Sequence, residues 1–217
     1  MQITTYTAVF GQIGDKLQQP QQVPDDIPCV AYVDTEQPYE KNGWQCLPPV
    51  WEHKTNPRLR ARRHKLLPHQ LFPEAEYTLW VDGCLTPWGD PRDLVKKYLK
   101  NHDICLFRHM ERHCVYQELE ACLKLRKDHP QVMRAQVDRY RREGYPYNNG
   151  LAETTAVLRR HTPELNQFNE QWWAELSANS IRDQLSFDYL CWKHGLTYSV
   201  FSGNRCRSPH FQWRPHR

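Results

Sequence analysis

Short apolar runs alternate with longer stretches of helical periodicity along this chain of 217 residues. Apolar runs bounded by turn residues are typical of strands, whereas apolar positions three or four apart indicate helices. The runs predict strands at residues 5–10, 29–34, 76–81, 103–107, 151–159 and 197–201. The helical patterns fall at residues 57–71, 91–99, 115–127, 131–143, 163–176 and 181–193. Because strands and helices alternate, we predict a single α/β domain over residues 1–217, with a mostly parallel central sheet flanked by helices and a basic, aromatic tail at residues 203–217.

The most informative run ends abruptly on one carboxylate. Residues 77–81 are apolar or aromatic except for Thr78, and Asp82 and a glycine follow directly. Asp34 has the same position after an earlier strand, and Gly11 and Gly14 follow the first one. Because α/β enzymes bind ligands at the carboxyl ends of parallel strands, this pattern predicts a ligand crevice. A strand-end Asp is also common in turns, which is the better interpretation of a single one.

The predicted helix at residues 57–71 is strongly basic on one side. Arg62 and Lys65 are candidate diphosphate ligands, because a guanidinium pairs with phosphate through two hydrogen bonds and an ammonium supplies a point charge. A solvated face or a patch for an anionic polymer would have the same composition. The formal net charge of +4 tolerates an anionic substrate but does not require nucleic acid.

Amides and carboxylates gather in two later segments. Asn149 precedes a glycine, and Glu153 follows in the predicted strand. Such donors and acceptors suit sugar hydroxyls, although an Asn-Gly turn alone would explain the loop. Asp183 and Gln184 lie in the first turn of a predicted helix, where capping and dipole compensation are the simpler interpretation.

Metal and thiol patterns are weak. His109 and His113 are four residues apart, but Met110 stands where the metalloprotease pattern requires Glu, so zinc is not favoured. The eight cysteines include no Cys-x-x-Cys pair, and we expect reduced, mostly buried thiols.

The chain contains no apolar run of about 18 residues, which excludes a transmembrane helix. Its first residues enter a strand-like pattern without a basic and apolar leader. We therefore expect a cytoplasmic protein.

Four segments together resemble a known family. They are residues 64–83, 107–112, 144–151 and 182–187, in consistent order within residues 29–201. They resemble a glycosyltransferase-like family of plants and bacteria, long catalogued as a domain of unknown function. The resemblance implies a compact GT-A fold, a Rossmann-like α/β domain that binds nucleotide sugars. That family is distantly similar to family 8 glycosyltransferases, which use an Asp-x-Asp motif with a divalent metal.

The resemblance also assigns roles to single residues. Asp82 matches the first Asp of the metal motif, but Cys84 stands in place of the second, which puts dependence on Mn²⁺ or Mg²⁺ in question. His210 would supply a second metal ligand. Asn149 matches the turn before the acceptor-side strand, and the Asp183–Gln184 pair would lie near the anomeric carbon.

The resulting hypothesis is a glycosyltransferase that moves a sugar from a nucleotide-diphosphate donor, most readily a UDP-sugar, to an acceptor hydroxyl. Gly11 and Asp34 would hold the nucleoside. Arg62, Lys65 and Asp82 would take the diphosphate, because fixed cations stabilise the departing charge.

On the acceptor side, Glu153 or Asp183 would orient sugar hydroxyls or deprotonate the acceptor. His109 would contact the acceptor or the donor sugar, and Gln184 the donor.

Two alternatives stay open. The missing second Asp would suit a protein that binds nucleotide sugars or glycans without turnover. The basic helix and the tail, with its interleaved Arg and aromatic residues, would suit a transferase that acts on a modified nucleic-acid base. The acceptor is thus a glycan, a small molecule or nucleic acid.

Overall fold

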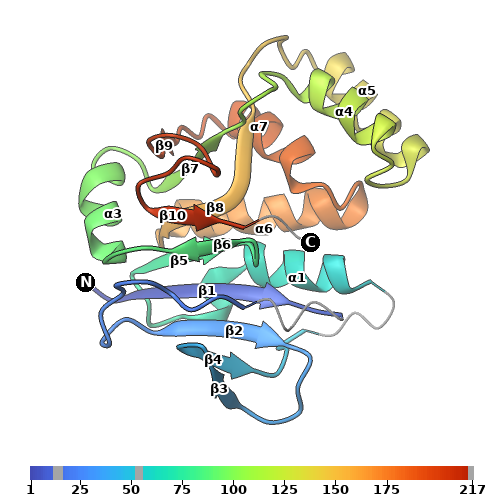
Figure 1. Ribbon diagram of the computed structural model, residues 1–217. Coiled ribbons are helices and arrows are strands. Elements are labelled where there is room, and N and C mark those ends of the chain that lie inside the picture. The colour runs from blue at the N-terminus through green and yellow to red at the C-terminus, as the bar shows by residue number, and fades with distance from the viewer. Residues whose placement is uncertain (12–16, 52–55, 215–217) are drawn as a thin grey trace.

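The computed structural model describes residues 1–11, 17–51 and 56–214, which build one large sheet and its covering helices. The sheet has eight strands in the order β3-β4-β2-β1-β5-β8-β7-β9 (Figure 1). Their bounds are Ile3–Val9 (β1), Cys29–Val33 (β2), Tyr39–Lys41 (β3), Trp44–Leu47 (β4), Tyr77–Val81 (β5), Ile104–Arg108 (β7), Ala152–Arg160 (β8) and Ser199–Val200 (β9). The sequence predicts a glycine loop after β1. Its residues 12–16, which include Gly14, lie outside the described residues.

Strand directions confirm a mostly parallel sheet with two exceptions, β8 and the edge strand β3, which is antiparallel to β4. Strands β4, β2, β1 and β5 pair in parallel, and β7 pairs in parallel with β9. Strand β8 is antiparallel to both of its neighbours, β5 and β7. The beginning of β8 therefore lies at the same edge of the sheet as the carboxyl ends of β1, β2 and β5.

Seven helices are described around this sheet. Their bounds are Pro57–Leu66 (α1), Pro68–Leu71 (α2), Pro91–Tyr98 (α3), Val115–Lys124 (α4), Pro130–Arg142 (α5), Pro163–Ala178 (α6) and Asp183–His194 (α7). Helices α1, α6 and α7 pack with Tyr6 and Trp80 into the core on one face of the sheet. Helix α3 packs with Leu79 and Val81 on the other face. Helices α4 and α5 project together at the upper right of Figure 1.

Local sequence explains where helices begin and end. The side chain of Asn56 accepts a hydrogen bond from the backbone N–H of Leu59 at 3.0 Å, and Pro57 occupies the first turn of α1. The single helix expected over residues 57–71 is wrong. Because Pro68 has no backbone N–H and restricts the residue before it, α1 ends at Leu66 and α2 starts anew.

The hydrophobic pattern did not predict two short strand pairings. Strands β3 and β4 form a hairpin around Asn42 and Gly43, whose φ angles of 53° and 73° suit a tight Asn-Gly turn. Strand β6 (Leu85–Pro87) pairs antiparallel with β10 (Phe211–Trp213), so the expected tail folds back onto the domain. Strands of two to four residues carry too little alternation to be recognised.

The expectation that most thiols are buried is confirmed. All eight cysteines are free, and five are buried: Cys46, Cys105, Cys114, Cys122 and Cys191. Within residues 1–11, 17–51 and 56–214, no helix has the length and apolarity needed to cross a bilayer.

Candidate functional site

Three strand ends meet at one edge of the sheet. Gly11, Asp34 and Asp82 follow the neighbouring strands β1, β2 and β5, as their positions in the sequence predicted. The antiparallel β8 adds its first residues, Glu153 and Thr154, to the same edge. This edge therefore gathers carboxylates from three parts of the chain, namely Asp34, Asp82 and Glu153.

A buried ion pair lies at the centre of this edge. The Nζ atom of Lys65, at the end of α1, is 2.6 Å from Oδ2 of Asp183 and 3.4 Å from Oδ1 of Asp82. It also donates a hydrogen bond to Oγ1 of Thr154 at 3.1 Å. The side chains of Lys65 and Asp183 are 0% and 1% exposed, so this ion pair is shielded from water, whereas Asp82 is 25% exposed.

Positive charge surrounds Asp183, the first residue of α7. The guanidinium of Arg62 is 3.4 Å from its Oδ2, and Thr154 donates a hydrogen bond to the same oxygen at 2.8 Å. Burial would raise the pKa of Asp183, but the charges of Arg62 and Lys65 hold it well below its ordinary value. Burial also lowers the pKa of Lys65, while the two carboxylates act in the opposite direction. Asp183 is therefore a fixed anion.

Asp82 is held by its own strand, β5, and by the neighbouring β8. The indole N–H of Trp80 donates to its Oδ1 at 2.7 Å, and its backbone N–H donates to the carbonyl of Thr155 at 2.7 Å. Cys84 lies two residues further on, and burial with the nearby Asp82 charge raises the pKa of its thiol to about 12. Cys84 is thus a neutral thiol where an Asp-x-Asp motif would have its second carboxylate.

A cleft of about 430 Å³ opens beside this cluster. Asp82 and Asp183 line it together with four cationic side chains: Arg62, Lys127, Arg182 and Arg205. A second hollow of about 250 Å³ shares Lys127, Arg182, Gln184 and Arg205 with it and extends to His109. Because they share these four residues, we call the two hollows together the cationic cleft.

Several polar atoms in and beside the cationic cleft lack a protein partner. Oδ1 of Asp183 and Nε of Arg182, which line the cleft, are buried without a hydrogen bond from the described residues, and so is Oε2 of Glu153, the ion-pair partner of Arg205. An unsatisfied buried polar atom costs about 1–3 kcal/mol, so these atoms are the expected contacts of a polar ligand. They offer both acceptors and a donor.

Glu153 faces the C-terminal segment. Its Oε1 accepts hydrogen bonds from Arg205 and from the hydroxyl of Thr155, both at 3.0 Å. The side chain of Glu153 is 1% exposed. The pairing of β10 with β6 brings Arg205 to this position.

His109 lies at the end of β7 among hydrogen-bond donors. Its Nδ1 accepts from the backbone N–H groups of Glu111 and Arg112, each at 3.1 Å, and its Nε2 is 2.8 Å from the Arg112 guanidinium. Burial and the Arg112 charge lower the pKa of His109. His109 is therefore held neutral beside the cleft.

The predicted nucleoside contacts lie together at the ends of β1 and β2. The backbone N–H of Gly11 donates to Oδ2 of Asp34 at 2.5 Å, and Arg60 forms an ion pair with the same carboxylate. The Arg60 guanidinium also lies 4.0 Å from the ring centroid of Phe10. Both predicted residues are exposed beside α1.

Other predicted residues are placed differently. Gln184 lines both parts of the cationic cleft and accepts a hydrogen bond from Arg182 at 3.2 Å. Asn149 is exposed on the loop before β8, where its amide is 3.5 Å from the Tyr145 hydroxyl. His210 lies 3.1 Å from the hydroxyl of Tyr98 in α3.

The donor set does not fit a divalent metal. Within the described part of the chain, no three His, Cys, Asp or Glu side chains are grouped as metal ligands. Lys65 already occupies the space between the two candidate carboxylates, and Cys84 is a neutral thiol. Mg²⁺ and Mn²⁺ prefer oxygen ligands, and neither the ammonium of Lys65 nor the thiol of Cys84 supplies one.

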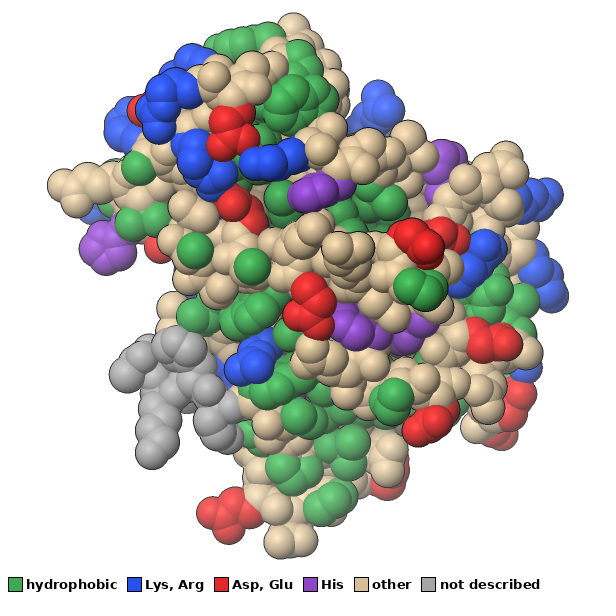
Figure 2. All heavy atoms as spheres, turned by 180° about the vertical axis from the view of Figure 1, so that it is seen from behind, with side chains coloured by type: hydrophobic (Ala, Val, Ile, Leu, Met, Phe, Trp, Pro, Cys, Tyr) green, Lys and Arg blue, Asp and Glu red, His purple; other side chains and the backbone are tan. Residues whose placement is uncertain are grey.

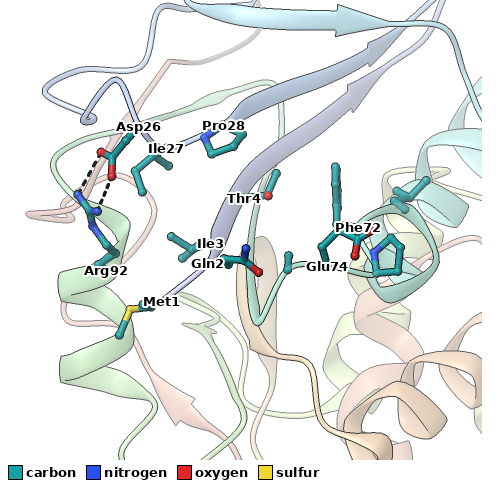
Figure 3. A pocket seen from close by; sticks show the side chains of 13 residues that line it. Met1, Gln2, Ile3, Thr4, Asp26, Ile27, Pro28, Phe72, Glu74 and Arg92 are labelled. Atoms are coloured by element: carbon teal, nitrogen blue, oxygen red, sulfur yellow. Dashed lines mark hydrogen bonds and ion pairs between the residues drawn. The ribbon is translucent and has the colours of Figure 1, made fainter.

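A larger hollow of about 550 Å³ lies at the opposite edge of the sheet (Figure 3). Ile3, Ile27 and Phe72 line it, and Arg92 at its rim pairs with Asp26 at 2.8 Å. It lies at the amino ends of the parallel strands, away from the usual ligand position in such sheets. The carboxylate cluster favours the cationic cleft instead.

Sequence reasoning missed three of the four cleft cations and Thr154. Arg182 stands beside the predicted Asp183, so the motif around it was a usable signal. No sequence signal placed Lys127 or Arg205 in the cleft, because only the fold brings them to this edge.

Comparison with known proteins defines the family. Residues 50–209 match the model of the TOD1/MUCI70, glycosyltransferase-like domain. The chain is 34% identical over 158 residues to the probable hexosyltransferase MUCI70 of Arabidopsis thaliana, which covers 66% of this chain and 27% of that protein. It is 28% identical over 146 residues to the alkaline ceramidase TOD1 of the same plant, covering 62% of this chain and 32% of that protein. The matched region thus spans about a third or less of each relative.

Among solved structures, mouse xyloside xylosyltransferase 1 in its apo form matches with a TM-score of 0.48 and 11% identity, over 92% of this chain and 84% of that one. The family match extends over most of the chain and includes α1, Asp82, β8 and Asp183. The chain therefore belongs to the TOD1/MUCI70 glycosyltransferase-like domain family.

Proposed function

We propose that this domain transfers a hexosyl or pentosyl group from a nucleotide-diphosphate sugar to an acceptor hydroxyl. The observation that carries the proposal is the cationic cleft, where four cations surround Asp82 and Asp183, and Oδ1 of Asp183 has no hydrogen-bond partner among the described residues. A sugar diphosphate has matching chemistry, because its phosphates are anionic and its hydroxyls both donate and accept hydrogen bonds. The family match supports the same class of reaction.

The cations would act on the leaving group. In the transfer, the bond between the anomeric carbon and the phosphate oxygen breaks, and the nucleoside diphosphate departs with the bonding electrons. Fixed positive charges stabilise this developing negative charge. Arg62, Arg182 and Arg205 line the cleft and suit two-point contact with phosphate oxygens.

The two carboxylates would have different tasks. The low pKa of Asp183 makes it a weak base, so its unpartnered Oδ1 suits a hydrogen bond from a donor-sugar hydroxyl. We assign the acceptor hydroxyl to Glu153, whose Oε2 has no partner in the described structure. Glu153 would take the hydroxyl proton as the acceptor oxygen bonds to the anomeric carbon.

The nucleoside would lie toward Gly11 and Asp34, where an exposed carboxylate follows β2 beside the basic α1. A UDP-sugar donor, a GT-A type of fold and a distant relation to family 8 glycosyltransferases belong to this proposal. So does action in the cytoplasm.

A glycan or small-molecule acceptor is the version we favour over nucleic acid. On the face in Figure 2, Lys and Arg side chains gather mainly over the α4–α5 region. Arg139 there pairs with Glu175 at 2.5 Å, and Arg141 with Asp138 at 2.7 Å. Charges paired in this way offer less to a phosphate backbone than free ones.

A ligand panel tests the proposal. Nucleoside diphosphates and their sugars should raise the melting temperature of the purified domain, because binding to the folded state stabilises it. Arg62→Gln should remove most of that shift, whereas Arg142→Gln, at the exposed end of α5, should not. Binding without release of nucleoside diphosphate, with any acceptor, would instead support a sugar-binding protein without turnover.

A further inference from the structure

The two carboxylates at the candidate site share one ammonium group. Lys65 Nζ lies 2.6 Å from Asp183 Oδ2 and 3.4 Å from Asp82 Oδ1, and it donates to Thr154 at 3.1 Å. These three oxygens come from a strand end, a strand start and a helix start. A small cation bound here would use the same oxygens.

The surroundings leave little need for a further cation. Arg62 reaches the same two carboxylates, at 3.4 Å from Asp183 and 3.9 Å from Asp82. The Trp80 indole N–H already donates to Oδ1 of Asp82. A divalent ion would have to displace the fully buried Lys65 side chain and enter beside a guanidinium, at a high electrostatic cost.

We propose that Lys65 is a built-in cation that replaces the divalent metal, so that the domain binds its nucleotide ligand without Mn²⁺ or Mg²⁺. Lys65 is then a positioning residue, which holds Asp82 and Asp183 in place. The arginines of the cationic cleft contact the phosphates directly. The part of this inference that concerns nucleotide binding rests on the proposed function.

Direct metal binding tests the inference without any nucleotide. Mn²⁺ is titrated into the wild-type domain and followed by electron paramagnetic resonance. We expect no bound Mn²⁺ at millimolar metal. In Lys65→Ala, which vacates the space between the carboxylates, bound Mn²⁺ should appear. Lys96→Ala is the matched control, because Lys96 pairs with Asp93 on the surface at 3.0 Å.

Saturable Mn²⁺ binding to the wild type that is lost in Asp82→Asn would overturn the inference. This comparison stands even where Lys65→Ala fails to fold. A second arm measures the affinity for UDP and other nucleoside diphosphates by calorimetry, in EDTA and in Mn²⁺. We expect equal affinity within about twofold, whereas a roughly tenfold or greater loss in EDTA would also overturn the inference. If no nucleoside diphosphate binds under either condition, the proposed function fails, while the Mn²⁺ titration still decides the role of Lys65.

Discussion

Lys65 and Asp183 form an ion pair, with Nζ and Oδ2 2.6 Å apart, that is almost fully shielded from water. The residues are 118 positions apart, and their contact fixes the end of α1 against the start of α7. A buried pair of this kind is costly to break, because the remaining partner keeps an uncompensated charge. The pair therefore links the stability of the domain to the geometry of its candidate site.

The first prediction concerns this pair. Lys65→Met should lower the free energy of unfolding by about 3–5 kcal/mol, since Asp183 and Asp82 lose their shared partner. Urea denaturation followed by circular dichroism measures the change. Lys96→Met removes an exposed pair and should cost less than about 1 kcal/mol. Equal costs for the two variants would show that the buried pair has no special role.

The second prediction concerns Arg205. Arg205→Gln should weaken nucleoside-diphosphate binding roughly ten- to a hundredfold, because a charge-assisted contact contributes about 1.5–3 kcal/mol. It also leaves the buried Glu153 without its cation, so the unfolding free energy is measured in parallel. Arg142→Gln provides the control with a surface arginine. Unchanged affinity in Arg205→Gln would remove this residue from the donor site.

The third prediction separates binding from turnover at Glu153. Glu153→Gln keeps the shape and the hydrogen bond from Arg205 but cannot accept a proton. We expect kcat to fall by about 10²–10⁴, the usual contribution of a general base. Donor affinity, measured by calorimetry, should stay within about twofold. A normal kcat would assign the acceptor proton to another group.

The fourth prediction is a loss of stability in mild acid. His64 is fully buried, and its two ring nitrogens contact the backbone of Val50 and Arg60 at 3.1 and 2.9 Å. Burial lowers the pKa of His64 from 6.5 to about 4 in the folded state. The unfolded chain therefore binds the proton more readily, and stability falls as the pH drops from 6.5 to 4, by at most about 3 kcal/mol for this group.

Unfolding free energies measured at pH 7, 5.5 and 4.5 would show this dependence of stability on pH. These values lie roughly within the pH window that the shifted pKa defines. His64→Gln should flatten this dependence, whereas substitution of the exposed His194 should not. His161 contributes in the same direction, since burial also lowers its pKa to about 4. A slope that is identical in wild type and His64→Gln would rule out His64 as its source.

The positions of the strand-end residues could be predicted from the sequence, because they depend on the local hydrophobic pattern. An apolar run that stops at Asp82 or Asp34 shows where a strand ends, and parallel pairing then places both at one edge. Asp183 could also be predicted from a local signal, because it lies within a short motif that resembles the family.

Contacts between distant segments were beyond such reasoning. Arg205 reaches Glu153 only because β10 pairs with β6, two strands of three residues each. The antiparallel direction of β8 was equally hidden, because alternation along a strand does not reveal its direction. The sequence suggested Lys65 as a diphosphate ligand, and only the fold shows its ammonium between two carboxylates.

The most direct test of the central claim is release of nucleoside diphosphate from a panel of nucleotide sugars, measured with the purified domain and a mixture of candidate acceptors. We predict release from at least one sugar nucleotide by the wild type. The release should fall at least roughly tenfold in Arg62→Gln and stay unchanged in Arg142→Gln. Neither binding nor release with any sugar nucleotide, by a domain shown to be folded, would contradict the proposed glycosyl transfer.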